Sequence, residues 1–249
     1  YEISRSDWSS DVCSSDYGVP GESYLSVLDA LYDFSNKINF ISTRHESAAS
    51  FMAEAYGKLT GEVGICFVTR GPGATNASIG VHTAMQNSSP MILFIGQIGR
   101  DMTEREAFQE IDYKAYFGSI SKWVVQVNNA DRLPEIIGRA FSMALSGRPG
   151  PVVVSLPEDM LRDLTSAVAI NKIQKTCAEI SVTQVNLIKD ELEKSKKPLI
   201  ICGGGGWSDI GRDYLKRFAE SVNIPVICGF RNQDLMDTNS FAYVGDASF

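Results

Sequence analysis

The carboxylate of Glu46 stands directly before a run of small and apolar residues, in the stretch TRHESAASFMAEAYGKLTG at 43–61. A carboxyl group shielded from water has its charged form disfavoured, so it can share a proton with a weakly basic nitrogen. A structural interpretation competes with this one, because Thr43-x-x-Glu46 fits a capping box at the start of a helix. Taken alone, this pattern favours the capping role for Glu46, since helices often begin in this way.

Two tight turns contain the other candidate ligand-binding residues: GVPGES at 18–23 and TRGPGATN at 69–76. Each precedes a predicted helix, and the second also follows a predicted strand. In a parallel sheet such turns gather at the carboxyl edge of the strands, where ligands bind. Neither turn matches the phosphate-binding loop Gly-x-x-x-x-Gly-Lys-Ser/Thr, because the lysine is absent. A nucleoside triphosphate site is therefore not predicted.

The elements that must position these residues alternate between helical periods and short apolar strands. The sequence predicts helices over 22–34, 46–59, 73–87 and 131–145, and strands over 64–69, 90–97 and 152–157. Continuous apolar strands separated by helices are typical of a parallel sheet that is covered on both faces. We therefore predict an α/β fold with a doubly wound parallel sheet.

A second unit begins after a segment of weak pattern at 166–182, which we interpret as a linker. Helices are predicted over 183–195 and 208–222, each followed by an apolar strand, PLIICGGGG and then IPVICGF. Two strands are too few to bury both faces of a parallel sheet, so we expect the chain to be a fragment. The glycine run at 203–206 could hold a dinucleotide or form a simple turn.

The first 16 residues do not fit the pattern that starts at Tyr17. The segment RSDWSSDVCSSD at 5–16 resembles a translated sequencing adapter. We therefore expect residues 1–16 to be non-native and exclude them from the fold prediction. The alternative is a genuine polar tail.

Composition narrows the function classes. The 249 residues have a formal net charge of −7 without a basic block, which argues against nucleic-acid binding. No apolar run is long enough to cross a membrane. Cys66, Cys202 and Cys228 lie in apolar strand-like runs, where buried free thiols are expected, and a reducing, cytoplasmic setting follows. No metal site is predicted in this chain.

Six motifs in register resemble one family. They are GVPGES (18–23), RHE (44–46), TRGPGATN (69–76), GQ (96–97), AFQE (107–110) and SGRPGPV (146–152). Each is weak alone, but their order and spacing are similar to those of the thiamine-diphosphate-dependent enzymes of the acetolactate synthase and pyruvate oxidase group. The resemblance implies a pyrimidine-binding domain at 17–165, the linker at 166–182 and a truncated, Rossmann-like α/β central domain at 183–249.

The resemblance implies a catalytic role for Glu46. In this family a glutamate at this position bonds the aminopyrimidine ring of the cofactor and so helps the removal of the thiazolium C2 proton. With the motifs in register, catalysis becomes the favoured role of Glu46, and Thr43 is expected to cap the helix without the reciprocal bond from Glu46. Gln109 resembles the active-site glutamine near the substrate carbonyl, with Phe108 as an apolar wall, and a solvated loop residue is the equal alternative.

The cofactor-binding positions implied by the resemblance lie in the two turns: Val19, Pro20, Gly21, Gly71, Pro72 and Asn76. Glycine and proline allow the backbone to approach the pyrimidine ring closely. Ordinary turn chemistry explains the prolines equally well. Arg70 departs from the family pattern, in which a small residue is expected, and this departure leaves the substrate open.

The expected function is thus the amino-terminal part of a thiamine-diphosphate-dependent carboligase that decarboxylates a 2-oxo acid such as pyruvate. The family holds the diphosphate and Mg²⁺ in a third domain, whose Gly-Asp-Gly…Asn motif this chain lacks. The central domain of the family binds FAD in some members only. The active sites of the family lie between subunits, so a homodimer or homotetramer is implied. A lyase, oxidase or decarboxylase of the family is an alternative, and so is a non-catalytic protein that binds a nucleotide or a partner.

Overall fold

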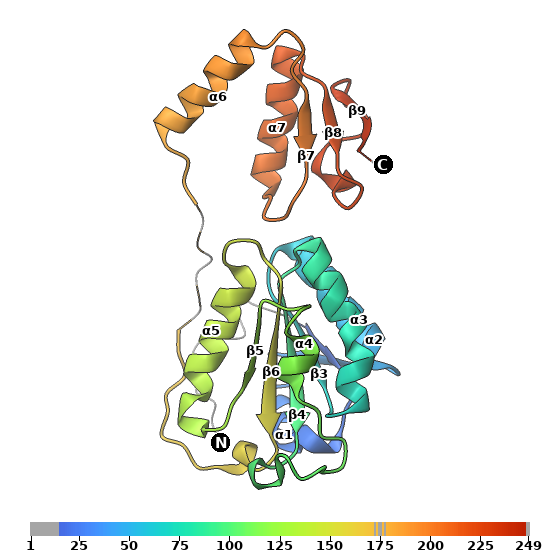
Figure 1. Cartoon of the computed structure of the whole chain (residues 1–249), viewed down its shortest axis with the longest axis vertical. Coiled ribbons are helices and arrows are strands. Elements are labelled where there is room, and N and C mark those ends of the chain that lie inside the picture. Colours follow the sequence, from blue (N-terminus) through green and yellow to red (C-terminus); the bar gives the residue numbers. More distant parts are fainter. Residues whose placement is uncertain (1–14, 172, 174–175, 177, 248–249) are drawn as a thin grey trace. The chain divides into compact units, whose positions relative to one another are not determined.

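The computed structural model describes residues 15–171, 173, 176 and 178–247. The chain divides into two compact units, residues 1–176 and 177–249, which are described separately (Figure 1). The division falls within the segment 166–182 that we predicted to be a linker.

The first unit is built on a six-stranded, wholly parallel sheet with the strand order β2-β1-β3-β4-β6-β5. Its strands β3, β4 and β6 are buried along their whole length, as expected for apolar strands covered on both faces. The strands are β1 (Ser15–Gly18), β2 (Asn39–Ser42), β3 (Gly64–Val68), β4 (Met91–Gln97), β5 (Trp123–Gln126) and β6 (Pro151–Pro157).

Helices cover both faces of this sheet, which confirms the predicted fold class (Figure 1). Side chains from α2 and α3 join one core cluster, and side chains from α1 and α5 join the other. The helices are α1 (Leu25–Asp33), α2 (Glu46–Thr60), α3 (Pro72–Asn87), α4 (Tyr113–Phe117) and α5 (Leu133–Leu145). Short 3₁₀ helices are η1 (Glu22–Tyr24), η2 (Arg100–Met102), η3 (Ala130–Arg132) and η4 (Met160–Arg162).

Three strands of the first unit were not predicted. Ser15 and Asp16 belong to β1, although we expected them to lie outside the fold, while residues 1–14 lie outside the described part of the chain. Strand pairing uses backbone groups, so a polar sequence can take this place between β2 and β3. The strands β2 and β5 have only four residues each and none that is fully buried, so they carry little apolar signal.

The second unit contains a parallel sheet with the order β7-β8-β9. Its elements are α6 (Val182–Lys194), β7 (Ile200–Cys202), α7 (Asp209–Val222), β8 (Val226–Cys228), η5 (Gln233–Leu235) and β9 (Tyr243–Asp246). The expectation of two strands was wrong, because β9 adds a third. A register shift opposite Val226 and Ile227 interrupts its pairing, and Gly245 has a positive φ of 130°, so β9 lacks a regular strand pattern.

Two further predictions concern side chains and membrane spans. Cys66, Cys202 and Cys228 are buried free thiols, as predicted. No helix among the described residues combines the length and apolar character that a membrane span requires.

Candidate functional site

Glu46 is the first residue of α2, and it does not take part in a capping box. The N-cap is His45, whose Nδ1 accepts a hydrogen bond from the backbone N–H of Ser47. Thr43 lies too early to cap the helix, and its hydroxyl instead donates to the carbonyl of His45. The alternative of a capping box and the expected Thr43 cap are therefore wrong, because β2 ends at Ser42 and the helix starts at Glu46, two residues later than the box requires.

The Glu46 side chain is directed toward α3. Its Oε2 accepts a hydrogen bond of 2.9 Å from Nδ2 of Asn76, which lies in the first turns of that helix. A Cβ atom built on Gly73 would lie 3.5 Å from Oε1 of Glu46. The absence of a side chain at Gly73 thus leaves the second carboxylate oxygen uncovered beside the turn.

The close approach of α2 and α3 explains how these two side chains meet. Four residues after each of them, Ser50 of α2 lies against Gly80 of α3, where a Cβ atom would lie 2.3 Å from Ser50 Oγ. Alanines line the remaining contact, and Ala49, Ala53, Ala74, Ala77 and Ala84 are all fully buried. Small side chains permit this backbone approach, as the run after Glu46 predicted.

The charge of Glu46 also acts on groups inside the sheet. Burial is the largest cause that raises the pKa of the Tyr24 phenol, followed by the charges of Cys66 and Glu46. Burial likewise raises the pKa of the Cys66 thiol, followed by the charges of Glu46 and Asp16. Glu46 therefore lies close enough to Tyr24 and Cys66 for its charge to act on the pKa of both groups.

The two predicted turns lie against each other at this edge of the sheet. Gly21 packs on Thr69 so closely that a Cβ atom would lie 2.5 Å from Thr69 Cβ. Ser23 is fully buried between the turns, where its Oγ shares a hydrogen bond of 2.7 Å with Thr69 Oγ1 and accepts one of 3.2 Å from the N–H of Arg70. The first turn is closed by Tyr24, whose hydroxyl donates to the carbonyl of Val19.

Gln109 reaches the same edge from the loop after β4. A Cβ atom on Gly71, which has a positive φ of 61°, would lie 2.6 Å from Cβ of Gln109. Gln109 itself has a left-handed φ of 66°, which is uncommon for a residue with a side chain. Phe108, the expected apolar wall, is 74% exposed.

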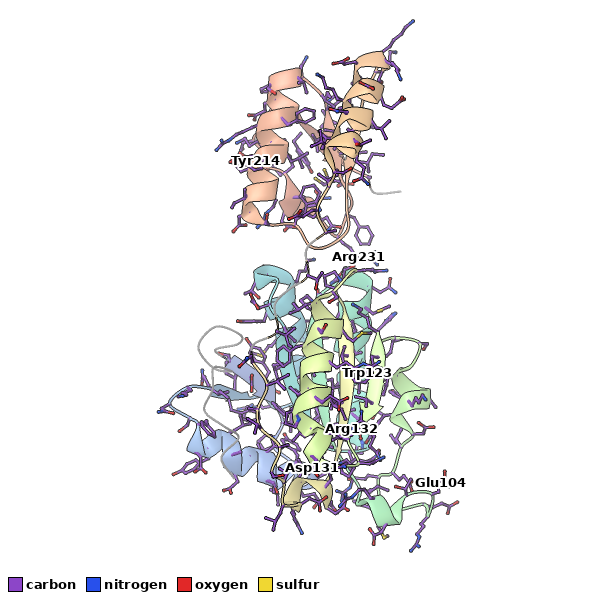
Figure 2. The ribbon with its side chains drawn as sticks, turned by 90° about the vertical axis from the view of Figure 1, so that its left-hand side faces the viewer. Glu104, Trp123, Asp131, Arg132, Tyr214 and Arg231 are labelled. Atoms are coloured by element: carbon purple, nitrogen blue, oxygen red, sulfur yellow. The ribbon has the colours of Figure 1, made fainter. Side chains whose placement is uncertain are left out.

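Three side chains hold this loop. Tyr113 accepts a hydrogen bond of 3.0 Å from the N–H of Gly71 through its hydroxyl oxygen, and burial raises the pKa of that phenol to about 12. Gln97, at the end of β4, donates from Nε2 to the carbonyl of Ile111. The carboxylate of Glu110 accepts from the backbone N–H groups of Glu104 and Ala107. Figure 2 shows Glu104 at the outer edge of this loop.

The structure therefore brings together all predicted site positions at one sheet edge, but in two contact groups. In the first group, Thr69 and Gly73 link Gly21 to Glu46, which bonds to Asn76. The second group consists of Gly71 and Gln109. Val19 is half-buried, while the side chains of Pro20, Pro72 and Asn76 are exposed around the turns.

Sequence reasoning missed four contributors to this site: Ser23, Thr69, Gln97 and Tyr113. Their contacts join residues between 14 and 47 positions apart, which no local pattern reveals. The only available signal was their position inside the motifs or next to them.

The residues present fit one part of a cofactor. A carboxylate oxygen beside Gly73, exposed prolines and closely packed turns can hold a flat ring with hydrogen-bonding nitrogen atoms. In the described part of the chain, no three His, Cys, Asp or Glu side chains are grouped so that they could hold a metal ion. The glycine run of the second unit forms a turn with positive φ at Gly204 and Gly206.

Comparisons with known proteins agree with this geometry. Residues 14–116 match the family model described as thiamine pyrophosphate enzyme, N-terminal TPP binding domain, and residues 185–249 match the model of the central domain of the same enzymes. The chain belongs to the thiamine pyrophosphate enzyme family. The first of the two matches contains Glu46, both turns and the loop with Gln109.

The relatives of this family member carry acetolactate synthase names. The acetolactate synthase isozyme 3 large subunit of Escherichia coli is 35% identical over 218 residues, which are 85% of this chain and 38% of that protein. The mitochondrial acetolactate synthase of Schizosaccharomyces pombe is 35% identical over 90% of this chain and 35% of its own length. The large subunit of Lactococcus lactis is 36% identical over 85% of this chain and 37% of its own length. The chain thus spans a little over a third of the length of these relatives.

Proposed function

We propose that the chain is the amino-terminal part of a thiamine-diphosphate-dependent carboligase of the acetolactate synthase type, which decarboxylates a 2-oxo acid such as pyruvate. One observation carries the proposal: Glu46 is half-buried at the carboxyl edge of the sheet, with Oε2 held by Asn76 and Oε1 beside Gly73. The names of the relatives support the reaction type.

In this proposal each residue has a defined task. Glu46 holds a proton at Oε1 against a ring nitrogen of the aminopyrimidine, and Asn76 keeps the carboxylate in place through Oε2. The backbone of Val19, Gly21 and Gly71 lines the ring. When bound, thiamine diphosphate supplies the electron sink for decarboxylation. Gln109 orients the substrate carbonyl from its loop beside Gly71.

The remaining parts of the active site come from outside this chain. We propose that the diphosphate and Mg²⁺ are bound by a further domain and that the site is completed by a second subunit of a homodimer or homotetramer. The 249-residue chain alone should then bind the cofactor poorly and lack activity. The buried free thiols Cys66, Cys202 and Cys228 support a reducing compartment such as the cytoplasm.

The decisive test replaces the carboxylate of Glu46 in the full-length protein. Wild type should bind thiamine diphosphate in the presence of Mg²⁺, as measured by calorimetry, and should release CO₂ from pyruvate. Glu46→Gln should lower kcat by at least roughly 100-fold, since proton transfer by a positioned side chain contributes about 10²–10⁴-fold.

A matched control lies on the same helix. Glu54 is buried two turns after Glu46, where its carboxylate accepts hydrogen bonds from Asn87 and Ser89. Glu54→Gln keeps an acceptor oxygen for these donors and should leave kcat within a few-fold of wild type. Equal turnover by Glu46→Gln and wild type would remove the catalytic assignment. A folded wild-type protein that does not bind the cofactor would favour a non-catalytic binding protein instead.

A further inference from the structure

Arg70 is a buried charge directly after β3, at the edge of the sheet where the candidate site lies. Its side chain is 10% exposed and forms ion pairs of 3.0 Å with Glu22 and with Glu158. Its remaining guanidinium nitrogen, Nε, is buried and has no hydrogen-bond partner. A buried, incompletely paired charge lowers the stability of the fold. Stability therefore does not explain why an arginine occupies position 70.

The two partners of Arg70 belong to the ends of other strands. Glu22 lies in η1, in the turn that follows β1, and Glu158 follows β6 directly. The backbone N–H of Glu158 donates to the carbonyl of Gln97 at the end of β4. Because β4 lies between β3 and β6 in the sheet, the guanidinium spans across a strand to reach Glu158. One side chain therefore ties together the segments that follow β1, β3 and β6.

We propose that Arg70 is a positioning residue for the cofactor ring, because its guanidinium fixes the spacing between the turn at 19–21 and the turn at 71–73. This inference rests on the proposed function. Arg70 itself lies in the second turn, while Glu22 immediately follows Gly21 of the first. The contacts of Ser23 with Thr69 and with the Arg70 amide hold the bases of the turns, and the ion pair of Arg70 with Glu22 adds a link through side chains.

The chemistry of the guanidinium suits this task. Its planar fork directs one terminal nitrogen to each carboxylate, whereas the ammonium group of a lysine is a single point of charge on a flexible stem. The side chains of Glu22 and Glu158 are 67% and 40% exposed, so each remains hydrated on its outer side. An apolar side chain at position 70 would fill much of the same space and would remove the unpaired Nε, but it would remove the side-chain link that the guanidinium adds between the two turns.

The test separates positioning from folding by measuring two quantities for each variant of the full-length protein. These are the melting temperature without cofactor and the Kd of thiamine diphosphate at fixed Mg²⁺ concentration. Arg70→Met should keep the melting temperature within about 3 °C of wild type. Its Kd should rise roughly ten-fold, because the turns are no longer held at the spacing that the ring requires. Arg70→Lys should give an intermediate Kd.

Arg132 provides a matched control on the surface. It forms an exposed ion pair with Glu135 of α5, and Figure 2 shows it at the start of that helix. Arg132→Met removes the same chemical group and should change neither quantity beyond error. A Kd for Arg70→Met equal to that of wild type would overturn the inference, and so would a rise in Kd that occurs only with a matching loss of melting temperature.

Two variants of the partner carboxylates decide the question if Arg70→Met does not fold. Glu22→Gln and Glu158→Gln each weaken one link at a partly exposed position. A higher Kd at an unchanged melting temperature supports the positioning role of Arg70, and an unchanged Kd in both variants rejects it. Failure of the proposed function has a different signature, because a folded wild-type protein would then not bind the cofactor at all. If wild type binds and Glu46→Gln alone loses turnover, a normal Kd for Arg70→Met rejects only the positioning role.

Discussion

The hydrogen bond between Tyr113 and Gly71 allows a quantitative test of how the loop with Gln109 is held. Tyr113 is 4% exposed, and its hydroxyl oxygen accepts from the buried N–H of Gly71 at 3.0 Å. Tyr113→Phe removes the acceptor without changing the shape of the ring, so no cavity term is added. The amide of Gly71 is then left unpaired in a dry environment.

The expected cost follows from this burial. An unsatisfied buried donor costs about 1–3 kcal/mol, and removing the buried hydroxyl regains part of that, so we expect a loss of about 1–2 kcal/mol in the free energy of unfolding. With a urea dependence of about 2–3 kcal/mol per molar, the unfolding midpoint should fall by roughly 0.3–1 M. Hydrogen exchange at the Gly71 amide should also become faster.

A neighbouring tyrosine on α4 serves as the control. The hydroxyl of Tyr116 donates to Ser78 Oγ at 3.3 Å, and Tyr116 is 42% exposed, so water can replace the lost partner. Tyr116→Phe should therefore cost less than about 0.5 kcal/mol. If both variants unfold at the same urea concentration, or if Tyr116→Phe is the less stable one, the assignment of the Tyr113 contact as a structural anchor is wrong.

Two other perturbations test the positioning elements. Gly80→Val should separate α2 from α3, because even a Cβ atom would lie 2.3 Å from Ser50 Oγ, and we expect a loss of about 2–3 kcal/mol in urea unfolding; a stability equal to wild type would contradict this packing. Asp159 tests pH dependence: partial burial acts to raise its pKa, but the hydrogen bonds from Arg100 outweigh it and lower the pKa. The resulting stability is present above the ordinary aspartate pKa of about 4 and is lost as pH falls through the lower folded value. The urea midpoint of Asp159→Asn should thus fall less than that of wild type between pH 6 and pH 3, and equal slopes would refute it.

The sequence predicted the fold well where apolar patterns are long. The strands β3, β4 and β6 and the helices α2 and α3 were recognised, because continuous burial and small-residue runs are properties of the local sequence. The same reasoning failed for β1, β2, β5 and β9. These strands are short and contain polar or glycine residues, so only their pairing with neighbours makes them strands.

The candidate site was predictable in its members but not in its contacts. The motifs placed Glu46 and Asn76 at the starts of two helices, yet the hydrogen bond between them depends on how those helices pack. The helix cap shows the same limit on a smaller scale. Because α2 starts at Glu46, His45 is the N-cap and Thr43 is not, although the sequence contains the motif Thr43-x-x-Glu46.

The inward setting of Glu46 is a consequence of helix packing. The contacts between Glu46 and Asn76 and between Ser50 and Gly80 are separated by four residues in both helices, which is about one turn. The second contact excludes any side chain at Gly80, so it holds the helix axes close together. At that separation a glutamate one turn earlier on α2 can reach across to α3 and its turn. The small residues that follow Glu46 therefore act through geometry as well as by excluding water, since they set the distance at which its carboxylate meets the turn of Gly73.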